Sequence, residues 1–296
     1  MDLRVLRYFL AVANEKNFSR AADLLHLTQP TLSRQIQDLE EELGEPVFVR
    51  YARHVELTAA GRFLKQRAEE ILALAKKTED EFRELNKGLS GNVHIGGGET
   101  IAMTHIGAVL RDVCATYPDI HFHLHSGNAD DMTERLERGL IDFAVVIEPF
   151  NLAHYESLRL PHRDVWGVVM PENAPLAQKT VIHKEDLLGL PLICSRQAIY
   201  QHQVGNTFHD WFGETFDALN IVGTFNLIFN ANLMVSNGLG YAIGLDGLVN
   251  TTDTGLTFRP FEPRLEAGTH VIWKKARIFS AASAVVLEAL KTRFGA

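Results

Sequence analysis

Residues 17–43 read NFSRAADLLHLTQPTLSRQIQDLEEEL, and this stretch decides the fold of the first part of the chain. Ser19 stands where a capping hydroxyl can begin a helix, so we expect a short helix over 20–25. Thr28 is expected to cap a second helix, because Pro30 is tolerated in the first turn of a helix. Apolar residues then recur at intervals of four, three and four, which predicts a buried stripe of Leu32, Ile36, Leu39 and Leu43. Two short helices joined this tightly form a helix-turn-helix.

The exposed side of the second helix carries side chains that suit contact with DNA. Gln and Arg can each form two hydrogen bonds with base edges in the major groove, and Ser can donate to bases or phosphates. Two short strands predicted at 47–49 and 55–57 follow as a hairpin with basic residues near its tip. The spacing alone leaves a three-helix packing module as an alternative. The candidate contact residues are Gln29, Pro30, Thr31, Ser33, Arg34, Arg50, Arg53 and His54.

A long helix is expected after this hairpin. Thr58 can cap it, and the helical pattern continues for about 28 residues, or about 40 Å. Its apolar stripe is narrow, so we expect the helix to pack against an identical helix in a dimer. A helix that lies on its own second domain is the alternative. A linker is expected at 86–91.

Strands and helices alternate over 92–296, which is typical of α/β domains whose ligands bind at the carboxyl ends of strands. The run 143–147 is apolar throughout, as expected for a strand covered on both faces. The other strands are expected at 93–96, 119–125, 166–170, 192–195, 222–225, 241–245 and 270–273, and the helices at 101–116, 130–138, 200–213, 227–237 and 280–294.

Length and composition indicate an ordinary globular protein. The 296 residues suggest two domains, and 46% hydrophobic residues can bury a core without disulfides. No apolar run is long enough to span a membrane, the N-terminus has no signal-peptide pattern, and Cys114 and Cys194 fit buried thiols, so we expect a cytoplasmic protein. The net charge of −8 argues against a protein that coats nucleic acid. Residues 1–88 nevertheless carry 14 Lys and Arg against 15 Asp and Glu, and these charges are segregated, so a local positive face can bind phosphates.

Sequence patterns for catalysis and for metal binding are weak. No GxSxG, HExxH, Walker loop or GxGxxG after a strand occurs, so no catalytic residues and no cofactor are expected. His121, His123 and His125 share one face of a predicted strand, but a polar subunit interface is favoured over a zinc site because no fourth ligand lies at a recognised spacing. No metal is therefore expected.

The N-terminal motifs closely resemble those of the LysR-type transcriptional regulators. The resemblance rests on FSRAADLLHLTQPTLSRQI at 18–36, LEEELG at 39–44, VFVR at 47–50 and LTAAG at 57–61. It implies a winged helix-turn-helix, a long dimerising linker helix, and a two-lobed α/β effector domain similar to the periplasmic solute-binding proteins. It also implies a homotetramer. Motif matching carries base or backbone contact over to Gln29, Pro30, Thr31, Ser33, Arg34 and Arg53, and phosphate contact to Ser19.

The resemblance also suggests the domain boundaries. The DNA-binding domain is expected over 1–58, the linker helix and hinge over 59–90, and the effector domain over 91–296. Within the last, lobe one is expected over 91–161 and 266–296, and lobe two over 162–265. Glycines that allow close approach, helix caps and polar strand ends give the candidate effector-binding residues: Gly97, Glu99, Thr100, Ile101, Asn128, Glu148, Ser195, Arg196, Gln197, Phe225 and Asn226.

These features together predict a sequence-specific DNA-binding regulator that is controlled by a small effector. The expected partners are double-stranded DNA with an interrupted inverted repeat, further copies of the chain, RNA polymerase, and a small carboxylate or amine-bearing metabolite, but no membrane. Glu99 argues mildly against a plain anion, because it lies beside the cap at Thr100. Two rival hypotheses are a solute-binding protein or transferase on the same two-lobed fold, and a structural nucleoid protein. The first leaves 1–88 without a purpose, and the second needs a strongly basic chain.

Overall fold

The computed structural model describes residues 1–296 except 52–53, 85–88, 201–206, 253 and 296. Contacts within the chain separate two compact units, 1–83 and 84–296, and each is described by itself. No helix in the described part of the chain is both long and apolar enough to cross a membrane.

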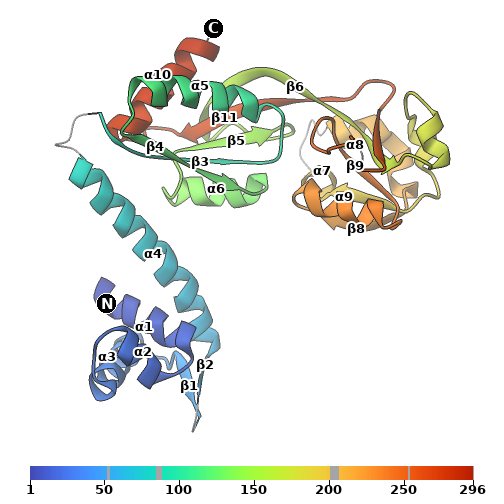
Figure 1. Ribbon diagram of the computed structural model, residues 1–296. Coiled ribbons are helices and arrows are strands. Elements are labelled where there is room, and N and C mark those ends of the chain that lie inside the picture. The colour runs from blue at the N-terminus through green and yellow to red at the C-terminus, as the bar shows by residue number, and fades with distance from the viewer. Residues whose placement is uncertain (52–53, 85–88, 201–206, 253, 296) are drawn as a thin grey trace. The chain divides into compact units, whose positions relative to one another are not determined.

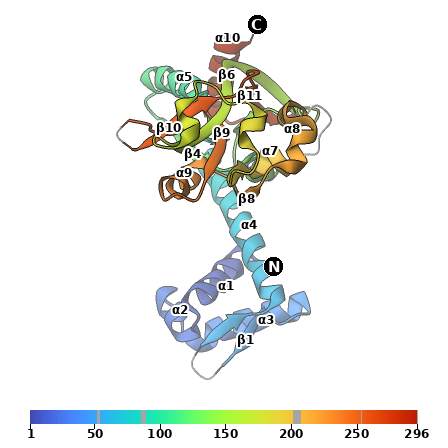
Figure 2. The same ribbon diagram turned by 90° about the vertical axis from the view of Figure 1, so that its right-hand side faces the viewer.

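The first unit is a bundle of helices with a small hairpin, which Figures 1 and 2 show beside helices α1 to α3. Strands β1 and β2 pair antiparallel, with Phe48 opposite Leu57. The long helix α4 follows the hairpin directly. The elements are α1 (Leu3–Glu15), α2 (Phe18–Leu24), α3 (Gln29–Leu43), β1 (Phe48–Arg50), β2 (Val55–Leu57) and α4 (Ala59–Glu84).

Helix boundaries in the first unit follow capping chemistry. The prediction that Ser19 caps α2 is wrong: the Asn17 side chain accepts the N–H groups of Ser19 and Arg20, and the helix begins at Phe18. Thr58 does cap α4, because its hydroxyl accepts the Gly61 N–H at 2.9 Å. Gly44 ends α3 in the left-handed region, with φ at 74°.

The core of the first unit confirms most of the predicted stripe. Leu32, Ile36 and Leu39 are buried, and they pack with residues from α1 and from the hairpin. Leu43 was expected to belong to the stripe, but it is 41% exposed. It is the last residue of α3, immediately before the Gly44 cap, and it lies outside the cluster of buried side chains that α1 and the hairpin form with α3.

The second unit is built on a nine-stranded sheet in its described residues, in the order β4-β3-β5-β11-β6-β9-β7-β8, with β10 beside β6. Its strands are β3 (Gly91–Gly97), β4 (Ile120–Ser126), β5 (Phe143–Ile147), β6 (Tyr155–Pro171), β7 (Leu192–Ser195), β8 (Ile221–Phe225), β9 (Tyr241–Leu245), β10 (Leu256–Pro260) and β11 (Glu266–Lys274). Its helices are α5 (Met103–Thr116), α6 (Ala129–Glu137), α7 (Arg196–Tyr200), α8 (Thr207–Phe212), α9 (Ile228–Ser236) and α10 (Ala281–Phe294), with 3-10 turns at Pro175–Gln178, Lys184–Leu187 and Gly213–Ala218.

Strand β6 runs through both lobes of this unit and connects them. Residues 155–165 of β6 pair with β11, and residues 166–171 pair with β9 and β10. We call the part built on β3, β4 and β5 the first lobe, and the part built on β7 to β10 the second lobe (Figure 1). Parallel strands β3, β4 and β5 in the first lobe and β7, β8 and β9 in the second direct their carboxyl ends to loops that carry polar residues.

Each lobe has its own core. In the first lobe, α5 and α10 pack on one face of the sheet around Phe143 and Val145, and α6 covers the other face at Ala144 and Val146. The apolar strand over 143–147 is therefore covered on both faces, as predicted. In the second lobe, α8 packs against Trp166 through Phe208, and α9 lies on the opposite face.

The structure differs from the expected elements mainly around β6. That strand has 17 residues, whereas the sequence predicts a strand only at 166–170. Its earlier part is rich in polar residues because it forms the connection between the lobes, so it has no continuous apolar run. Strand β10 was not predicted, since only Leu256 in it is fully buried. The helix predicted over 200–213 falls partly on 201–206, which lie outside the described residues.

Candidate nucleic-acid interface and ligand pocket

Helix α3 presents a polar surface opposite its buried leucines. Gln29, Pro30 and Arg34 are exposed, and with Ser33 they line a shallow groove that continues to Gln37, Asp38 and Glu41. Thr31 is exposed too, and its hydroxyl lies 2.8 Å from the hydroxyl of Thr28. The five residues predicted on α3 therefore share one accessible side of the helix.

Arg50 joins this surface to the hairpin. Its guanidinium donates to the Ser33 hydroxyl at 3.2 Å and to the Glu40 carboxylate at 3.3 Å, and it lies over the ring of Phe18. Glu40 also accepts the N–H groups of Val47 and Phe48. Arg50 is thus held at the junction of α3 and β1, with 43% of its side chain exposed. No local pattern marks Glu40 for this role, because it stands among other acidic residues at 41, 42 and 45.

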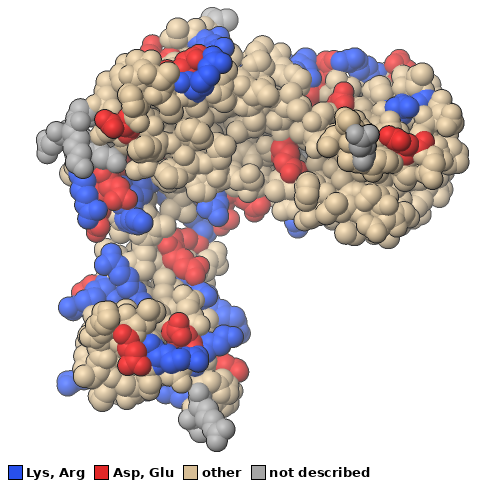
Figure 3. All heavy atoms as spheres, viewed as in Figure 1, with Lys and Arg blue, Asp and Glu red and all other residues tan. Residues whose placement is uncertain are grey.

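The remaining predicted DNA contacts lie at two other places. Ser19 is exposed in the first turn of α2, and its backbone N–H is bound by the Asn17 side chain. Arg53 lies outside the described residues. Figure 3 shows the charged side chains of residues 1–83 as separate clusters of both signs, whereas much of the drawn face of residues 84–296 is uncharged. This distribution agrees with the segregated charges noted in the sequence.

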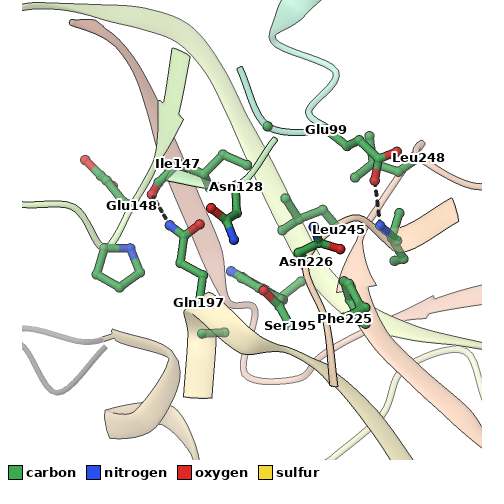
Figure 4. Close-up of a pocket in the computed structure, with 16 residues that line it drawn as sticks. Glu99, Asn128, Ile147, Glu148, Ser195, Gln197, Phe225, Asn226, Leu245 and Leu248 are labelled. Atoms are coloured by element: carbon green, nitrogen blue, oxygen red, sulfur yellow. Dashed lines mark hydrogen bonds between the residues drawn. The ribbon is translucent and has the colours of Figure 1, made fainter. Parts of the chain in front are cut away.

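A pocket lies between the two lobes of the second unit, with a space of about 570 Å³ that includes its open mouth. Residues that follow β3, β4 and β5 line one side, and residues from β7, β8, β9 and α9 line the other (Figure 4). The lining consists of Gly98, Glu99, Asn128, Ile147, Glu148, Pro149, Trp166, Ser195, Gln197, Ala198, Phe225, Asn226, Ile228, Gly244, Leu245 and Leu248.

The structure brings seven of the predicted effector residues into this pocket: Glu99, Asn128, Glu148, Ser195, Gln197, Phe225 and Asn226. Gly97, Thr100, Ile101 and Arg196 are not among the lining residues. The apolar wall formed by Trp166, Ile228, Leu245 and Leu248 was missed. Apolar side chains at strand ends carry no local signal that separates a pocket wall from the core.

Thr100 is buried beside the pocket and serves the connection between the lobes. Its hydroxyl donates to Asp164 at 2.6 Å and accepts the Ala102 N–H at 3.0 Å. Thr269 donates to the same Asp164 oxygen, and His162 lies 3.3 Å from the other oxygen. The carboxylate of Asp164 is fully buried, so these groups bind β6, β11 and the loop after β3 together. The prediction that Thr100 caps the following helix is wrong: α5 begins at Met103 with Ala102 at its N-cap, and the Thr100 hydroxyl binds Asp164 and the Ala102 N–H just before the helix.

Two hydrogen bonds cross the pocket from one lobe to the other (Figure 4). The Glu99 carboxylate accepts the N–H of Ile228, in the first turn of α9, at 2.6 Å. The Gln197 amide donates to the carbonyl of Ile147 at 3.3 Å. Both side chains were predicted at the site, but their role as bonds between the lobes depends on the fold.

Glu148 is held by the strand that crosses back between the lobes. It accepts the Gly268 N–H at 2.9 Å and lies 3.0 Å from Nε2 of His270. Burial by itself would raise the pKa of Glu148, but the hydrogen bonds from His270 and Gly268 outweigh it and hold the pKa below its ordinary value. The carboxylate therefore stays ionised at neutral pH.

The predicted histidine face is present on β4. His123 and His125 lie beside His94 of β3, with 3.2 Å between Nδ1 of His94 and Nε2 of His125, while His123 contacts Asn92. His121 is exposed on the same strand. Within the described ranges, no group of three or more His, Cys, Asp or Glu side chains is arranged to hold a metal ion.

Comparisons with known proteins cover both units. The family model described as "Bacterial regulatory helix-turn-helix protein, lysR family" matches residues 3–62, and "LysR substrate binding domain" matches residues 86–295. The chain is 32% identical over 280 residues to the Hca operon transcriptional activator HcaR of Escherichia coli, with 94% of this chain and 93% of that protein covered. It is also 32% identical over 205 residues to the transcriptional regulator IlvY of Escherichia coli, with 69% of each covered.

Solved structures share the fold. CbnR, a LysR family transcriptional regulator, matches with a TM-score of 0.77 at 21% identity and covers 99% of each chain. The structure of full-length CbnR with its target DNA matches with a TM-score of 0.75 at 21% identity, again over 99% of each chain. The predicted fold class, an N-terminal helix-turn-helix followed by a two-lobed α/β effector-binding region, is confirmed.

Proposed function

The chain belongs to the LysR family of transcriptional regulators, and from this premise we propose which of its residues bind DNA, which pair its subunits and which bind its effector. The family membership identifies a helix-turn-helix regulator with an effector-binding domain. The relatives it resembles are transcriptional regulators and activators, not enzymes.

Helix α3 reads base edges in the major groove. The observation that carries this proposal is the division of α3 into a buried side, with Leu32 and Ile36, and an exposed side with Gln29 and Arg34. Arg pairs with guanine and Gln with adenine through two hydrogen bonds each. Arg50 is braced by Ser33 and Glu40, so we assign it to the DNA backbone or to positioning Ser33. Ser19, Pro30, Thr31 and Arg53 complete the proposed contacts, as the family motif implies.

Arg34→Ala tests the base contact of α3. The full chain is titrated with a duplex of its own promoter region and with a scrambled duplex at the same salt concentration. We expect specific binding to weaken by about 1–3 kcal/mol per half-site, with little change on scrambled DNA. Arg111→Ala, which removes an exposed charge from the second unit, is the matched control. Equal losses on both duplexes would make Arg34 a phosphate contact and contradict base reading.

Helix α4 pairs two copies of the chain, so that the operator is an interrupted inverted repeat. Its exposed apolar side chains Phe63, Ile71, Leu74 and Phe82 fall within about a 100° arc of the helix. The second unit also exposes apolar side chains on β4, β8 and α9: Phe122, Leu124, Val222, Phe229, Leu233 and Met234. Such surfaces support association beyond a dimer, to the tetramer that the family resemblance implies.

The pocket between the lobes binds the effector. Polar groups converge there from the ends of parallel strands of both lobes, which is where open α/β sheets bind ligands. A ligand that contacts both lobes changes the balance between closed and open lobes by its difference in affinity for the two states. Small-angle scattering of the full chain with and without ligand tests this step, and unchanged curves at saturation would contradict it.

A further inference from the structure

The charged side chains among the described lining residues of the pocket are both acidic. Glu99 and Glu148 line it, and none of its described lining residues is Lys, Arg or His. Both glutamates follow strands of the first lobe, and Figure 4 shows Glu99 near Leu248 and Glu148 near Ile147. A carboxylate or phosphate ligand would lose part of its hydration in a partly enclosed space and meet two carboxylates, of which Glu148 lies against His270 and Glu99 against the start of α9.

The helix terminus that faces the pocket is already occupied. Backbone N–H groups at the start of α9 would otherwise attract an anion. The Ile228 N–H is bound by Glu99, and the Leu227 N–H is bound by the Asn226 side chain at 3.0 Å. The chain therefore fills its own anion position with the carboxylate of Glu99.

The other lining residues suit a ligand that carries a positive charge on an apolar hydrocarbon part. Trp166 and Phe225 supply aromatic rings, whose faces attract ammonium groups, and Ile147, Leu245 and Leu248 supply aliphatic contact. The Gln197 amide nitrogen donates to the Ile147 carbonyl, and the Gln197 amide oxygen is available as an acceptor for a ligand. Glu148 is anchored by Gly268 and His270, so its position does not depend on a ligand.

We propose that the effector of this pocket is a small organic ammonium ion whose charged nitrogen binds Glu148 and whose apolar part lies against the aromatic and aliphatic wall. This inference rests on the proposed function, in which the pocket is the effector site. A carboxylate on the same ligand would find only neutral donors such as Ser195 and Asn128 among the described lining residues, so we expect amines to bind in preference to the corresponding amino acids.

Small ligands with the same hydrocarbon part but a positive, negative or neutral group test the proposal. The full chain is titrated with butylammonium and cyclohexylammonium chloride, with butyrate and cyclohexanecarboxylate, and with the matching alcohols, at constant ionic strength. Thermal stability and ligand-observed NMR report binding. We expect the ammonium compounds to bind and the carboxylates not to bind. Binding of carboxylates, equal binding of alcohols, or no binding of any ammonium compound overturns the proposal.

Two variants of the pocket test which glutamate binds the ammonium group. Glu148→Gln is expected to weaken ammonium binding at least about tenfold, because it removes a charge-assisted hydrogen bond. Glu99→Gln keeps an oxygen that can cap α9, so the fold is preserved, and a smaller loss is expected. Glu156→Gln, an exposed carboxylate of β6 outside the pocket, is the control. Unchanged ammonium affinity in both pocket variants overturns the proposal. Operator binding is measured separately, so failure of the regulator assignment shows there and not in the amine titrations.

Discussion

Arg277 and Asp142 form an ion pair inside the first lobe. The Arg277 guanidinium donates to Asp142 at 2.5 Å and to the Ile141 carbonyl at 2.7 Å, and the side chains are 13% and 2% exposed. Asp142 also accepts the His94 N–H. Removing Arg277 leaves the buried Asp142 charge without its ion-pair partner, which is far costlier than losing a surface pair.

Arg277→Ala is therefore expected to lower the free energy of unfolding of the second unit by about 3–5 kcal/mol. Denaturant unfolding followed by tryptophan fluorescence measures it, because Trp166, Trp211 and Trp273 all lie in that unit. Arg111→Ala, which breaks an exposed pair with Asp112, is expected to leave the midpoint nearly unchanged. If both variants lowered the free energy of unfolding by similar amounts, the burial of the Arg277 pair would not contribute to stability.

Glu148 makes the stability of the second unit sensitive to acid. Its pKa in the folded chain lies below the ordinary 4.5, because the hydrogen bonds from His270 and Gly268 outweigh the opposing effect of burial. The ionised form therefore stabilises the fold above pH 4.5, and this contribution is lost as the pH falls through the lower folded value. The difference in unfolding free energy between wild type and Glu148→Gln should shrink between about pH 5.5 and 3. If this free-energy difference instead grew as the pH falls, the ionised form of Glu148 would not stabilise the fold, and the prediction would be contradicted.

At the scale of elements, the apolar side chains of α4 differ in exposure along the helix. Leu64 and Ala68 are buried against the core of the first unit, whereas Leu74 and Phe82 are 43% and 67% exposed further along the helix. An amphipathic helix of 26 residues that leaves its later apolar side chains in water gains stability by pairing.

Leu74→Glu is expected to weaken this pairing, because it places a charge in the proposed seam. Analytical ultracentrifugation of the full chain should show a smaller assembly, and operator affinity should fall with it. Lys76→Glu introduces the same side chain about 170° from the centre of the stripe and should leave the assembly intact. An unchanged mass for Leu74→Glu would exclude α4 as a pairing surface.

At the scale of the whole molecule, the proposed pairing through α4 would join two helix-turn-helix units that bind half-sites on one side of the duplex. Major grooves recur about every 10 base pairs, so spacing has a helical phase. Inserting about 5 base pairs between the half-sites should weaken binding more than inserting about 10. Gel-shift titrations of the three operators check this, with a single half-site as reference. Equal affinities for all spacings would mean that each DNA-binding unit acts alone.

Local patterns sufficed for much of the fold. The stripe Leu32, Ile36 and Leu39 and the Thr58 cap depend on neighbours within one or two turns, and the structure has them as predicted. Ser19 was misassigned as a cap because Asn17, two residues earlier, offers the same chemistry and takes both N–H groups. Leu43 fits the helical spacing of the stripe, but it lies at the end of α3 beyond the residues that cover the rest of the stripe, so it is exposed.

What the sequence by itself determined is the order of the elements, the helix-turn-helix and the polar strand ends, because these depend on periodicity and capping over short distances. The tertiary structure alone decided which strand ends share a pocket, that Glu99 reaches the first turn of α9 129 residues away, and that Glu148 lies against Gly268 and His270. Those contacts join segments far apart in the chain, and no local pattern encodes which distant group will neutralise or fix a given side chain.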